Sequence, residues 1–561
     1  MGLKDALSDR AFMGSAARQG LRHVVAAAAR ILTPFGPRAP HKLLIAPQDL
    51  RTADPTIATE IYAGQLKFAG KLLETHGRSP FELELPSEAF AAELHGFGWI
   101  RHLKAADSAL SRVNARAHVT DWIKAHRGRF GGIAAQPDVV ARRMISWLSQ
   151  TPMLLEEADA AFYQSFIKAL TADAARLTRA RRRAPQTEIK LMIQVALTHY
   201  ALCSAESDAA LKDAASQLCD LLEAQILSDG GHVSRNPQVP LHLLLDLLPL
   251  KLAFLWRRIQ TPQPIIAAID RMMPMLRMMR HADGAIALFN GMGATRADFV
   301  AAVLAQDDAM AAPPQNAPYT GYQRMEYKGS IVIIDAAKAP KPPLAGKSHA
   351  APAAFEFSAD GCRIVVNCGS PPAHRPEMQI YARLTAAHST LVVADESIGT
   401  FTRTNLFKAL LGPQFTRGAR VVGLQRADTP EGSLIMMEHD GYLKKQGLKH
   451  ERRLALSHDG QSFEGEDSVK VGGHTHDKPY ALRFHLHPQV KPTLRDDRRG
   501  VFLLLPNRKI WEFEVEEHEI MLEETIFFAS SEGLRRSEQI VIKANAAAHP
   551  TIAWSFHRTE Q

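Results

Sequence analysis

Three spaced segments of the chain decide the predicted fold: Gly346-Lys347-Ser348-His349-Ala350, Val366-Asn367-Cys368-Gly369 and Arg383-Leu384-Thr385-Ala386-Ala387-His388-Ser389-Thr390. Each contains a side chain that can act as a catalytic group or a metal ligand. Each also lies beside a short apolar run of the kind that forms a strand. The candidate functional residues are therefore expected on strands and on the loops that join them.

The chain around these segments divides into a helical half and a strand-rich half. From about residue 54 to about residue 310, alanine and leucine recur at spacings of three and four, which indicates helices arranged as a toroid of hairpins or as a solenoid. A proline-rich junction follows at 311–318. Beyond it, short apolar runs separated by Gly, Pro, Asp and Asn predict strands at 330–334, 363–366, 391–393 and 501–505.

Composition narrows the class of protein. A chain of 561 residues is long enough for at least two domains. Its formal net charge of +8 favours an anionic partner, although a basic soluble surface explains the charge equally well. Four cysteines provide no disulfide framework. The sequence has no Gly-rich phosphate loop, zinc finger or RNA-binding aromatic signature, so no nucleic-acid partner is predicted.

The most apolar stretch, residues 239–256, predicts a buried helix and no transmembrane segment, because polar residues and a proline interrupt it. These are His242, Asp246, Pro249 and Lys251. The apolar run at 24–29 is too short for the core of a signal peptide. A cytoplasmic location is therefore predicted, with the periplasm as the alternative. A homo-oligomer is compatible with the sequence.

The three quoted segments resemble the C-terminal half of heparinase II/III-type polysaccharide lyases. In those proteins the first segment reads Gly-His-x-His-x-Asp, the second carries Asp before a Gly, and the third reads Ala-His-Asn/Ser-Thr. The resemblance implies an (α/α) toroid followed by an antiparallel β-sandwich, with a sugar-binding cleft between them. It implies four segments: an N-terminal helical extension at 1–97, the toroid at 98–310, a linker at 311–320 and the sandwich at 321–561.

Several family positions carry other residues here. Aligned on Gly346, Lys347 replaces the usual catalytic His, while His349 matches the second His. Ala351 replaces the family Asp, Asn367 replaces a metal-binding Asp, and His388 matches the third metal ligand. Two imidazoles and a neutral amide make a poor zinc site. No cofactor is expected to be required; a structural zinc on His349 and His388 is the alternative to a hydrogen-bonded polar cluster.

The helical half contributes the loop 229–237, which matches a cleft-facing loop of the lyases. His232 is the expected base, and Arg235 and Asn236 are expected to bind the substrate; the alternative is a helix-entry loop capped by Asn236. The turn that usually carries the family's catalytic tyrosine, residues 281–284, has none. Tyr322 is therefore a reserve acid or base, and a packed aromatic is its alternative role.

The strand-rich half contributes the remaining candidates. Lys347 is a second reserve acid or base, or a group that holds a carboxylate. Arg383 suits a uronate carboxylate or a sulfate, with a structural ion pair as the alternative. His439 and Tyr442 are expected at the rim of the cleft.

The resemblance implies β-elimination on an acidic, uronate-containing polysaccharide, which needs a neutralised carboxylate, a base and an acid. A non-catalytic glycan-binding protein on the same scaffold is the first alternative, because of the replaced residues. A glycan hydrolase is the second, and it needs two carboxylates that flank the bond. Its candidates are Asp283, Glu356 and Asp440.

Overall fold

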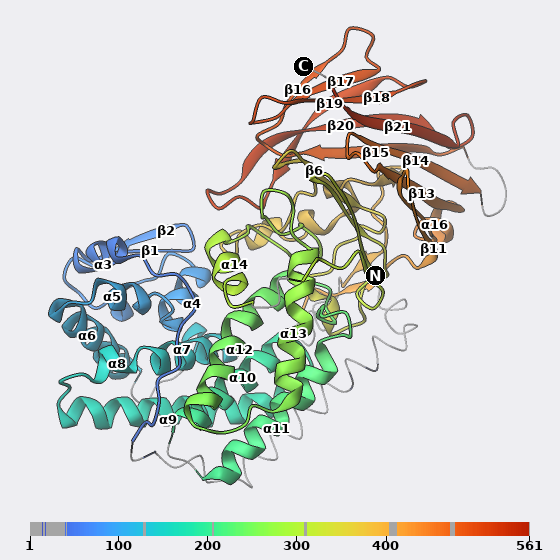
Figure 1. Cartoon of the computed structure of the whole chain (residues 1–561). Coiled ribbons are helices and arrows are strands. Elements are labelled where there is room, and N and C mark those ends of the chain that lie inside the picture. Colours follow the sequence, from blue (N-terminus) through green and yellow to red (C-terminus); the bar gives the residue numbers. More distant parts are fainter. Residues whose placement is uncertain are drawn as a thin grey trace.

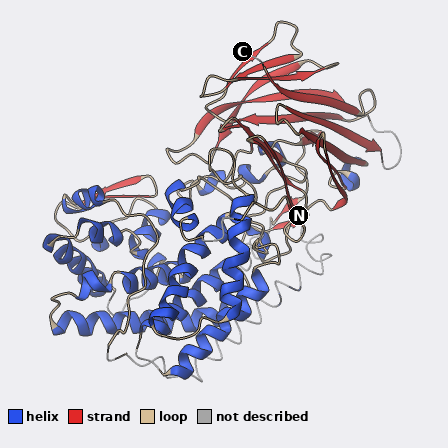
Figure 2. Cartoon of the chain, in the orientation of Figure 1, coloured by secondary structure: helices blue, strands red, loops and turns tan. Residues whose placement is uncertain are grey.

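The computed structural model of the protein describes residues 42–126, 131–204, 207–307, 311–402, 412–471 and 477–559, with positions 14, 17 and 40. Its first half is helical and its second half is built of strands (Figures 1 and 2). The change falls between helix α14, which ends at Leu304, and strand β3, which begins at Asn316. Strand β3 thus lies inside the segment 311–320 that was expected to be only a linker. The other predicted segment boundaries stay predictions.

The helical half consists of helices that pack against one another. Local signals start several of them: the side chains of Ser87, Asp159 and Ser207 accept hydrogen bonds from the first-turn N–H groups of α4, α9 and α11. Helix α10 packs against α7, α9, α11 and α12 and so lies at the centre. The helices are α3 (Pro55–Tyr62), α4 (Glu88–Gly96), α5 (Ile100–Ala106), α6 (Ala109–Ala125), α7 (Pro137–Ser149), α8 (Thr151–Leu155), α9 (Ala160–Arg183), α10 (Glu188–Cys203), α11 (Asp208–Gln225), α12 (Gln238–Trp256), α13 (Gln263–Met278) and α14 (Ala297–Leu304).

A β-hairpin interrupts the segment that was predicted to be purely helical. Strands β1 (Gln65–Phe68) and β2 (Lys71–Glu74) pair around Ala69 and Gly70. Both turn residues have positive φ, 46° and 69°, as a two-residue hairpin turn requires. The prediction of helices from residue 54 onward is therefore wrong here, because a four-residue strand is too short to show a clear period. Between residues 100 and 304, by contrast, the described residues contain only isolated bridges and no strand.

Helix α12 is the apolar stretch that was predicted to be a buried helix. It is long and apolar enough to cross a membrane, but 72% of its most apolar window is buried inside the protein. A core helix of a soluble domain passes the same test, so this helix is weak evidence for a membrane span. Its last two residues, Leu255 and Trp256, are exceptions that remain exposed.

The strand-rich half is an antiparallel sandwich of two large sheets. The nine-stranded sheet runs β19-β20-β15-β7-β6-β5-β4-β3, with β8 paired to β15, and the eight-stranded sheet runs β11-β12-β13-β14-β21-β18-β17-β16. The first sheet comprises β3 (Asn316–Ala317), β4 (Tyr322–Tyr327), β5 (Ser330–Asp335), β6 (Phe355–Ala359), β7 (Cys362–Val366), β8 (Leu391–Val393), β15 (Pro479–Leu486), β19 (Ile520–Phe527) and β20 (Arg535–Asn545). The second comprises β11 (Val421–Thr429), β12 (Gly432–His439), β13 (Leu448–Ser457), β14 (Ser462–Val471), β16 (Lys491–Leu494), β17 (Gly500–Leu504), β18 (Ile510–Val515) and β21 (Thr551–Arg558). Strands β9 (Thr400–Phe401) and β10 (Phe415–Arg417) form a small separate pair, and a short helix, α16 (Leu443–Gln446), precedes β13.

The central strands β5 and β6 of the nine-stranded sheet are buried on both faces. On β5, Val332 and Ile334 pack into the core between the two sheets, whereas Ile331 and Ile333 belong to the core of the helical half. Successive side chains of a strand point to opposite faces, so a doubly buried strand needs a continuous apolar run. The sequence 330–334 supplies that run, and the predicted order of a helical toroid followed by an antiparallel sandwich is confirmed.

A glycine on β14 makes room for Trp554, one of the two tryptophans of the sandwich core. A Cβ placed on Gly465 would lie 2.1 Å from the indole of Trp554 on β21, the strand paired with β14. The indole Nε1 then reaches the buried carboxylate of Asp467 at 2.8 Å. Any side chain at position 465 would have to displace this ring.

We predict that Gly465→Ala lowers the free energy of unfolding by about 1–3 kcal/mol, because overpacking forces the indole out of its site. Urea denaturation followed by circular dichroism measures the change. The control is Gly423→Ala on β11, where a Cβ would meet nothing within 4 Å. Equal stabilities of the two variants would contradict the packing argument.

Candidate functional site

The loop before α12 holds His232 in the interior. The ring is 1% exposed; its Nε2 donates to Gln225 Oε1 at 2.9 Å, and its Nδ1 accepts from the backbone N–H of Ser234 at 3.1 Å. Desolvation, followed by the charge of Lys347, lowers the pKa of His232 to about 3. Its lone pair is thus engaged and weakly basic. The expected base of the reaction lacks both access and strength in this arrangement.

Arg235 joins the two halves instead of facing a cleft. Its φ is 62°, and its buried guanidinium forms an ion pair with Asp335 at the end of β5 and donates to the carbonyl of Thr320 at 2.6 Å. The Arg235 guanidinium also lies over the ring of Tyr322, 5.0 Å from its centroid. Tyr322 donates its hydroxyl proton to the carbonyl oxygen of Arg235, and desolvation raises the pKa of this phenol. Both side chains serve the interface between the halves.

His349 and His388 form a directional hydrogen-bond relay. The N–H of Gly291 donates to His349 Nε2 at 3.1 Å, His349 Nδ1 lies 2.8 Å from His388 Nε2, and His388 Nδ1 lies 2.8 Å from the carbonyl of Leu384. The first and last partners assign the protons: each imidazole is neutral, accepts at Nε2 and donates at Nδ1. Desolvation agrees, since it lowers the pKa of His388 to about 4 and that of His349 well below its usual value.

These residues do not fit a zinc ion. Neutral imidazole binds metal through its lone pair, and here both lone pairs accept hydrogen bonds. The third expected ligand, Asn367, uses its oxygen to accept from the N–H of Ser389 at 3.0 Å. Among the described residues, no three His, Cys, Asp or Glu side chains converge as a metal site would require.

Lys347 and Asn236 meet at one glycine. A Cβ on Gly291 would lie 2.7 Å from Lys347 Cβ and 3.1 Å from Asn236 Nδ2, so only glycine permits this approach. The oxygen of Asn236 accepts from the N–H of Gln238 at the start of α12, as a capping residue does, and its Nδ2 has no partner among the described residues. The side chain of Lys347 is 58% exposed, with Nζ 3.8 Å from a carboxylate oxygen of Glu188.

The space beside these groups is small. One cavity is lined by the loop 231–237 together with Thr320, Tyr322 and residues of α12 and α13, and it encloses about 10 Å³. That is the room of a single water molecule. A sugar ring cannot enter the interior next to His232 and Tyr322 without a rearrangement of the two halves.

The other three candidates lie in the interior as well. The guanidinium of Arg383 donates hydrogen bonds to the backbone carbonyl oxygens of Ser348, at 2.9 Å, and Ala345, at 3.0 Å. His439 and Tyr442 are 1% and 3% exposed, so the expected position at the rim of a cleft is wrong. Each faces a buried partner: His439 Nε2 lies 3.0 Å from His450 Nδ1, and the Tyr442 hydroxyl donates to the carbonyl of Leu391.

His439 belongs to a second relay, inside the sandwich. The N–H of Gly441 donates to His439 Nδ1, His439 contacts His450, and His450 Nε2 lies 2.5 Å from Asp467 Oδ1. Arg452 pairs with the same carboxylate and holds the pKa of Asp467 below its usual value despite the opposing effect of burial. Among the described residues, no hydrogen bond joins His439, His450 or Asp467 to His349 or His388. The residues that were expected to form one composite site therefore belong to two separate clusters.

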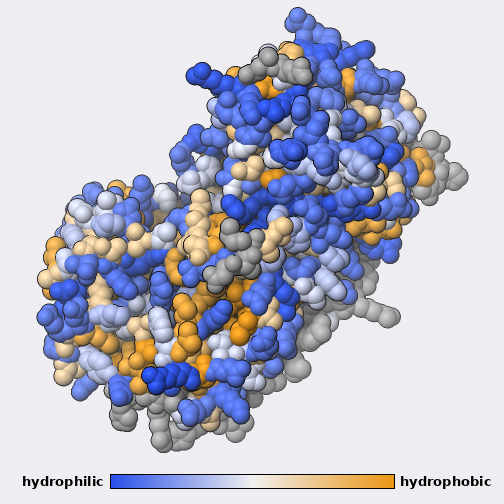
Figure 3. Space-filling model, viewed as in Figure 1, coloured by the Kyte–Doolittle hydropathy of each residue, from blue (hydrophilic) through white to orange (hydrophobic). Residues whose placement is uncertain are grey.

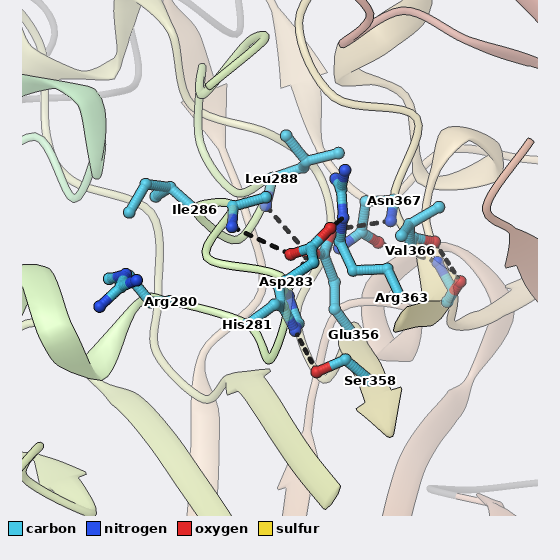
Figure 4. A network of polar contacts seen from close by, with 12 residues as sticks. Arg280, His281, Asp283, Ile286, Leu288, Glu356, Ser358, Arg363, Val366 and Asn367 are labelled. Atoms are coloured by element: carbon cyan, nitrogen blue, oxygen red, sulfur yellow. Dashed lines mark hydrogen bonds and ion pairs between the residues drawn. The ribbon is translucent and has the colours of Figure 1, made fainter. Parts of the chain in front are cut away.

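Sequence reasoning named Glu356 only as a candidate for hydrolysis and missed that its carboxylate ties the halves together. Glu356 on β6 is fully buried; its oxygens accept from His281 Nε2 at 2.9 Å, from the N–H of Leu288 at 3.1 Å and from the N–H and Nδ2 of Asn367 at 2.8 and 3.0 Å (Figure 4). An available signal was the glutamate between Phe355 and Phe357, because only a charged residue with buried partners is tolerated in such a strand.

The three carboxylates considered for hydrolysis serve separate partners. Asp283 accepts from Arg363 at 2.8 Å, Asp440 from Arg420 at 2.8 Å, and Glu356 from His281. Asn290, also missed, links the clusters of the interface: its Nδ2 donates to Tyr322 and Asp335, and its Oδ1 accepts from the N–H of His349. These contacts bring the loops 229–237, 281–291 and 346–350 together.

Comparison with known proteins identifies the family to which this architecture belongs. A family model described as heparinase II/III-like, C-terminal, matches residues 309–555. FtsZ-localized protein C of Caulobacter vibrioides is 30% identical over 544 residues, which are 93% of each chain. The chain belongs to the heparinase II/III-like family. This confirms the resemblance drawn from the three segments around His349, Asn367 and His388.

Solved structures of the family share the fold over almost the whole chain. A crystal structure of heparinase III superposes with a TM-score of 0.69 at 13% identity, covering 97% of this chain and 90% of that one. A mutant of heparan sulfate lyase HepC from Pedobacter heparinus gives a TM-score of 0.63 at 12% identity, covering 100% and 90%. At these identities the likeness concerns the fold: a polysaccharide lyase-like scaffold of helical toroid and β-sandwich.

We predict that the neutral His349–His388 relay makes the protein acid-sensitive. The folded-state pKa of His388, about 4, is below its unfolded value of 6.5, so its stabilising effect is present above pH 6.5 and is lost as the pH falls towards 4. The loss for this residue alone is about 3 kcal/mol. Denaturation measures the free energy of unfolding at pH 7 and at pH 4. Between these pH values, the double variant His349→Gln/His388→Gln should lose at least 3 kcal/mol less than the wild type, on the order of the contribution of His388 alone.

The control for this experiment is His76→Gln, since the side chain of His76 is 79% exposed. This variant should lose as much stability between pH 7 and pH 4 as the wild type. A pH dependence of the double variant that matches the wild type would refute the assignment of neutral rings.

Proposed function

We propose that this protein binds an acidic polysaccharide on the lyase-like scaffold without cleaving it by β-elimination. The observation that carries the proposal is that the candidate acid and base residues His232, His349 and Tyr322 are buried and hydrogen-bonded inside the protein. His232, His349 and Tyr322 all have their acceptor or donor atoms engaged inside the protein. The turn 281–284 adds no tyrosine to replace them.

Lys347 supports binding in place of catalysis. Its ammonium is exposed at the junction of the two halves, and its weak contact with Glu188 at 3.8 Å can yield to the carboxylate of a ligand. The neighbouring Asn236 Nδ2 is buried, so it adds no donor at the surface. A uronate carboxylate is a ligand group that the exposed ammonium of Lys347 suits.

We predict that a panel of uronate polysaccharides yields no absorbance from an unsaturated product, while at least one member binds. Lys347→Met should weaken that binding about fivefold, because an exposed charge pair contributes about 1 kcal/mol. Isothermal titration calorimetry measures the affinity, and Lys444→Met on α16 is the matched control. A rising absorbance would establish the lyase reaction, and new reducing ends without absorbance would establish hydrolysis.

A second candidate function is association with FtsZ. The relative named for its localisation with FtsZ matches 93% of this chain, so the likeness covers both the helical half and the sandwich. A surface that both proteins use to contact FtsZ can therefore include residues of either half. This candidate is compatible with glycan binding, since it asks for no catalytic group. The cytoplasmic location, with the periplasm as alternative, and the homo-oligomer stay predictions.

We predict that the full chain sediments with assembled FtsZ of its own organism and stays in the supernatant with unassembled FtsZ. The reason is that repeated sites along a filament raise the effective affinity of a weak contact. The pelleted fraction is measured on gels. Equal fractions with and without FtsZ would exclude this candidate and leave the glycan proposal untouched.

A further inference from the structure

The two large sheets of the sandwich end in the strands β3, β11, β16 and β19, and β11 is the least protected of these edges. An edge strand exposes main-chain N–H and C=O groups, and proteins shield it by keeping it short or by placing proline or charged side chains on it. Strand β3 has two residues, β16 has four that include Pro492, and β19 carries Glu523 and Glu524 side by side. Strand β11 has nine residues, with no proline and no lysine.

The main chain of β11 is paired on one side only. All of its pairings are with β12, from Val421 opposite His439 to Thr429 opposite Gly432. Apart from this pairing, no hydrogen bond among the described residues engages a main-chain group of 421–429. Because the N–H and C=O groups of successive residues in a strand point to alternate sides, about half of these residues present theirs to the outside.

The side chain of Arg426 holds this edge in place. Its Nη1 donates to the carbonyl oxygens of Gln315 at 3.0 Å and of Arg324 at 2.7 Å, and Arg324 lies on β4 of the other large sheet. The side chain of Arg426 is 15% exposed, so these bonds are shielded from water. A strand that is fixed before it binds loses little conformational entropy when a partner pairs with it. Strand β11 is therefore a preformed template for another strand.

The side chains of β11 fit a second copy of the same strand. Val422 and Leu424 are 49% and 41% exposed, and Figure 3 shows apolar surface at the edge of the sandwich where Figure 1 places β11. Just before the strand, the side chain of Arg420 is 74% exposed, and near its other end that of Asp428 is 52% exposed. Antiparallel pairing brings opposite ends of identical strands together, so each Arg420 comes beside an Asp428 of the second copy, and Leu424 lies near the middle of the contact.

We propose that β11 is a dimer interface, at which two copies of this chain pair antiparallel along β11 and join their eight-stranded sheets into one continuous sheet. A contact about a two-fold axis uses the same residues of both copies and is complete after two. Main-chain hydrogen bonds supply the attraction, and the opposite charges at the two ends of the strand select the antiparallel direction. The interface uses no residue to which glycan binding is assigned, so it stands or falls independently of that proposal.

Size-exclusion chromatography of the full chain with light scattering tests this interface. We expect the wild type to dimerise and the dissociation constant to rise by about tenfold or more in Val422→Lys/Leu424→Lys, because the lysines of the two copies repel each other across the pair. The matched control is Met521→Lys/Ile526→Lys on the edge strand β19, where the side chains are 40% and 43% exposed, and it should dimerise as the wild type does. A wild type that stays monomeric, or a β11 variant that dimerises as tightly as the control, overturns the proposal.

Amide hydrogen exchange of the wild type provides a second measurement that depends on no variant. When the dimer is diluted until it dissociates, amides within 421–429 should exchange faster, because their outward N–H groups lose the partner strand. Amides within 520–527 of β19 should exchange at the same rate at both concentrations. Exchange within 421–429 that is unchanged on dissociation would show that the dimer uses another surface and would overturn the assignment to β11.

Discussion

The double burial of the central strands β5 and β6 of the nine-stranded sheet is the constraint on which the rest of the structure depends. One face of β5 and β6 packs against the second sheet through residues such as Val332 and Phe355, and the other packs against the helices through Ile331 and Ile333. Each such side chain contributes about 1.5–3 kcal/mol when fully buried. The helical half and the sandwich thus share continuous apolar packing, which presses their loops against each other.

The same burial dictates what the polar residues at the junction can do. A buried polar group without a partner costs about 1–3 kcal/mol, so each must find one inside the protein. Glu356 therefore accepts hydrogen bonds from His281 and Asn367, and Asp335 forms an ion pair with Arg235. The imidazoles of the two relays stay neutral. Side chains that could perform acid–base chemistry are used to satisfy one another. The family scaffold is present, and these buried candidate groups stabilise the contact between its two halves.

Functions that remain open to such a protein lie at its surface. Helix α12 begins beside Asn236, next to the exposed Lys347, and ends at Trp256, roughly 28 Å away for nineteen residues. This helix thus connects the surroundings of the exposed Lys347 with the exposed side chains of Leu255 and Trp256. Binding to a glycan or to FtsZ would use exposed groups, and neither requires the buried relays to open.

The sequence by itself determined the order of the two halves, four strands of the sandwich and the family, because hydrophobic periodicity and the motif around His349 and His388 are local properties of the chain. It did not reveal the hairpin at 65–74, whose strands are too short to show a period. Only the tertiary structure decided the state of the candidate residues. Whether His232 is a base or a buried donor depends on Gln225 and on desolvation, which arise from segments that meet only in the folded protein.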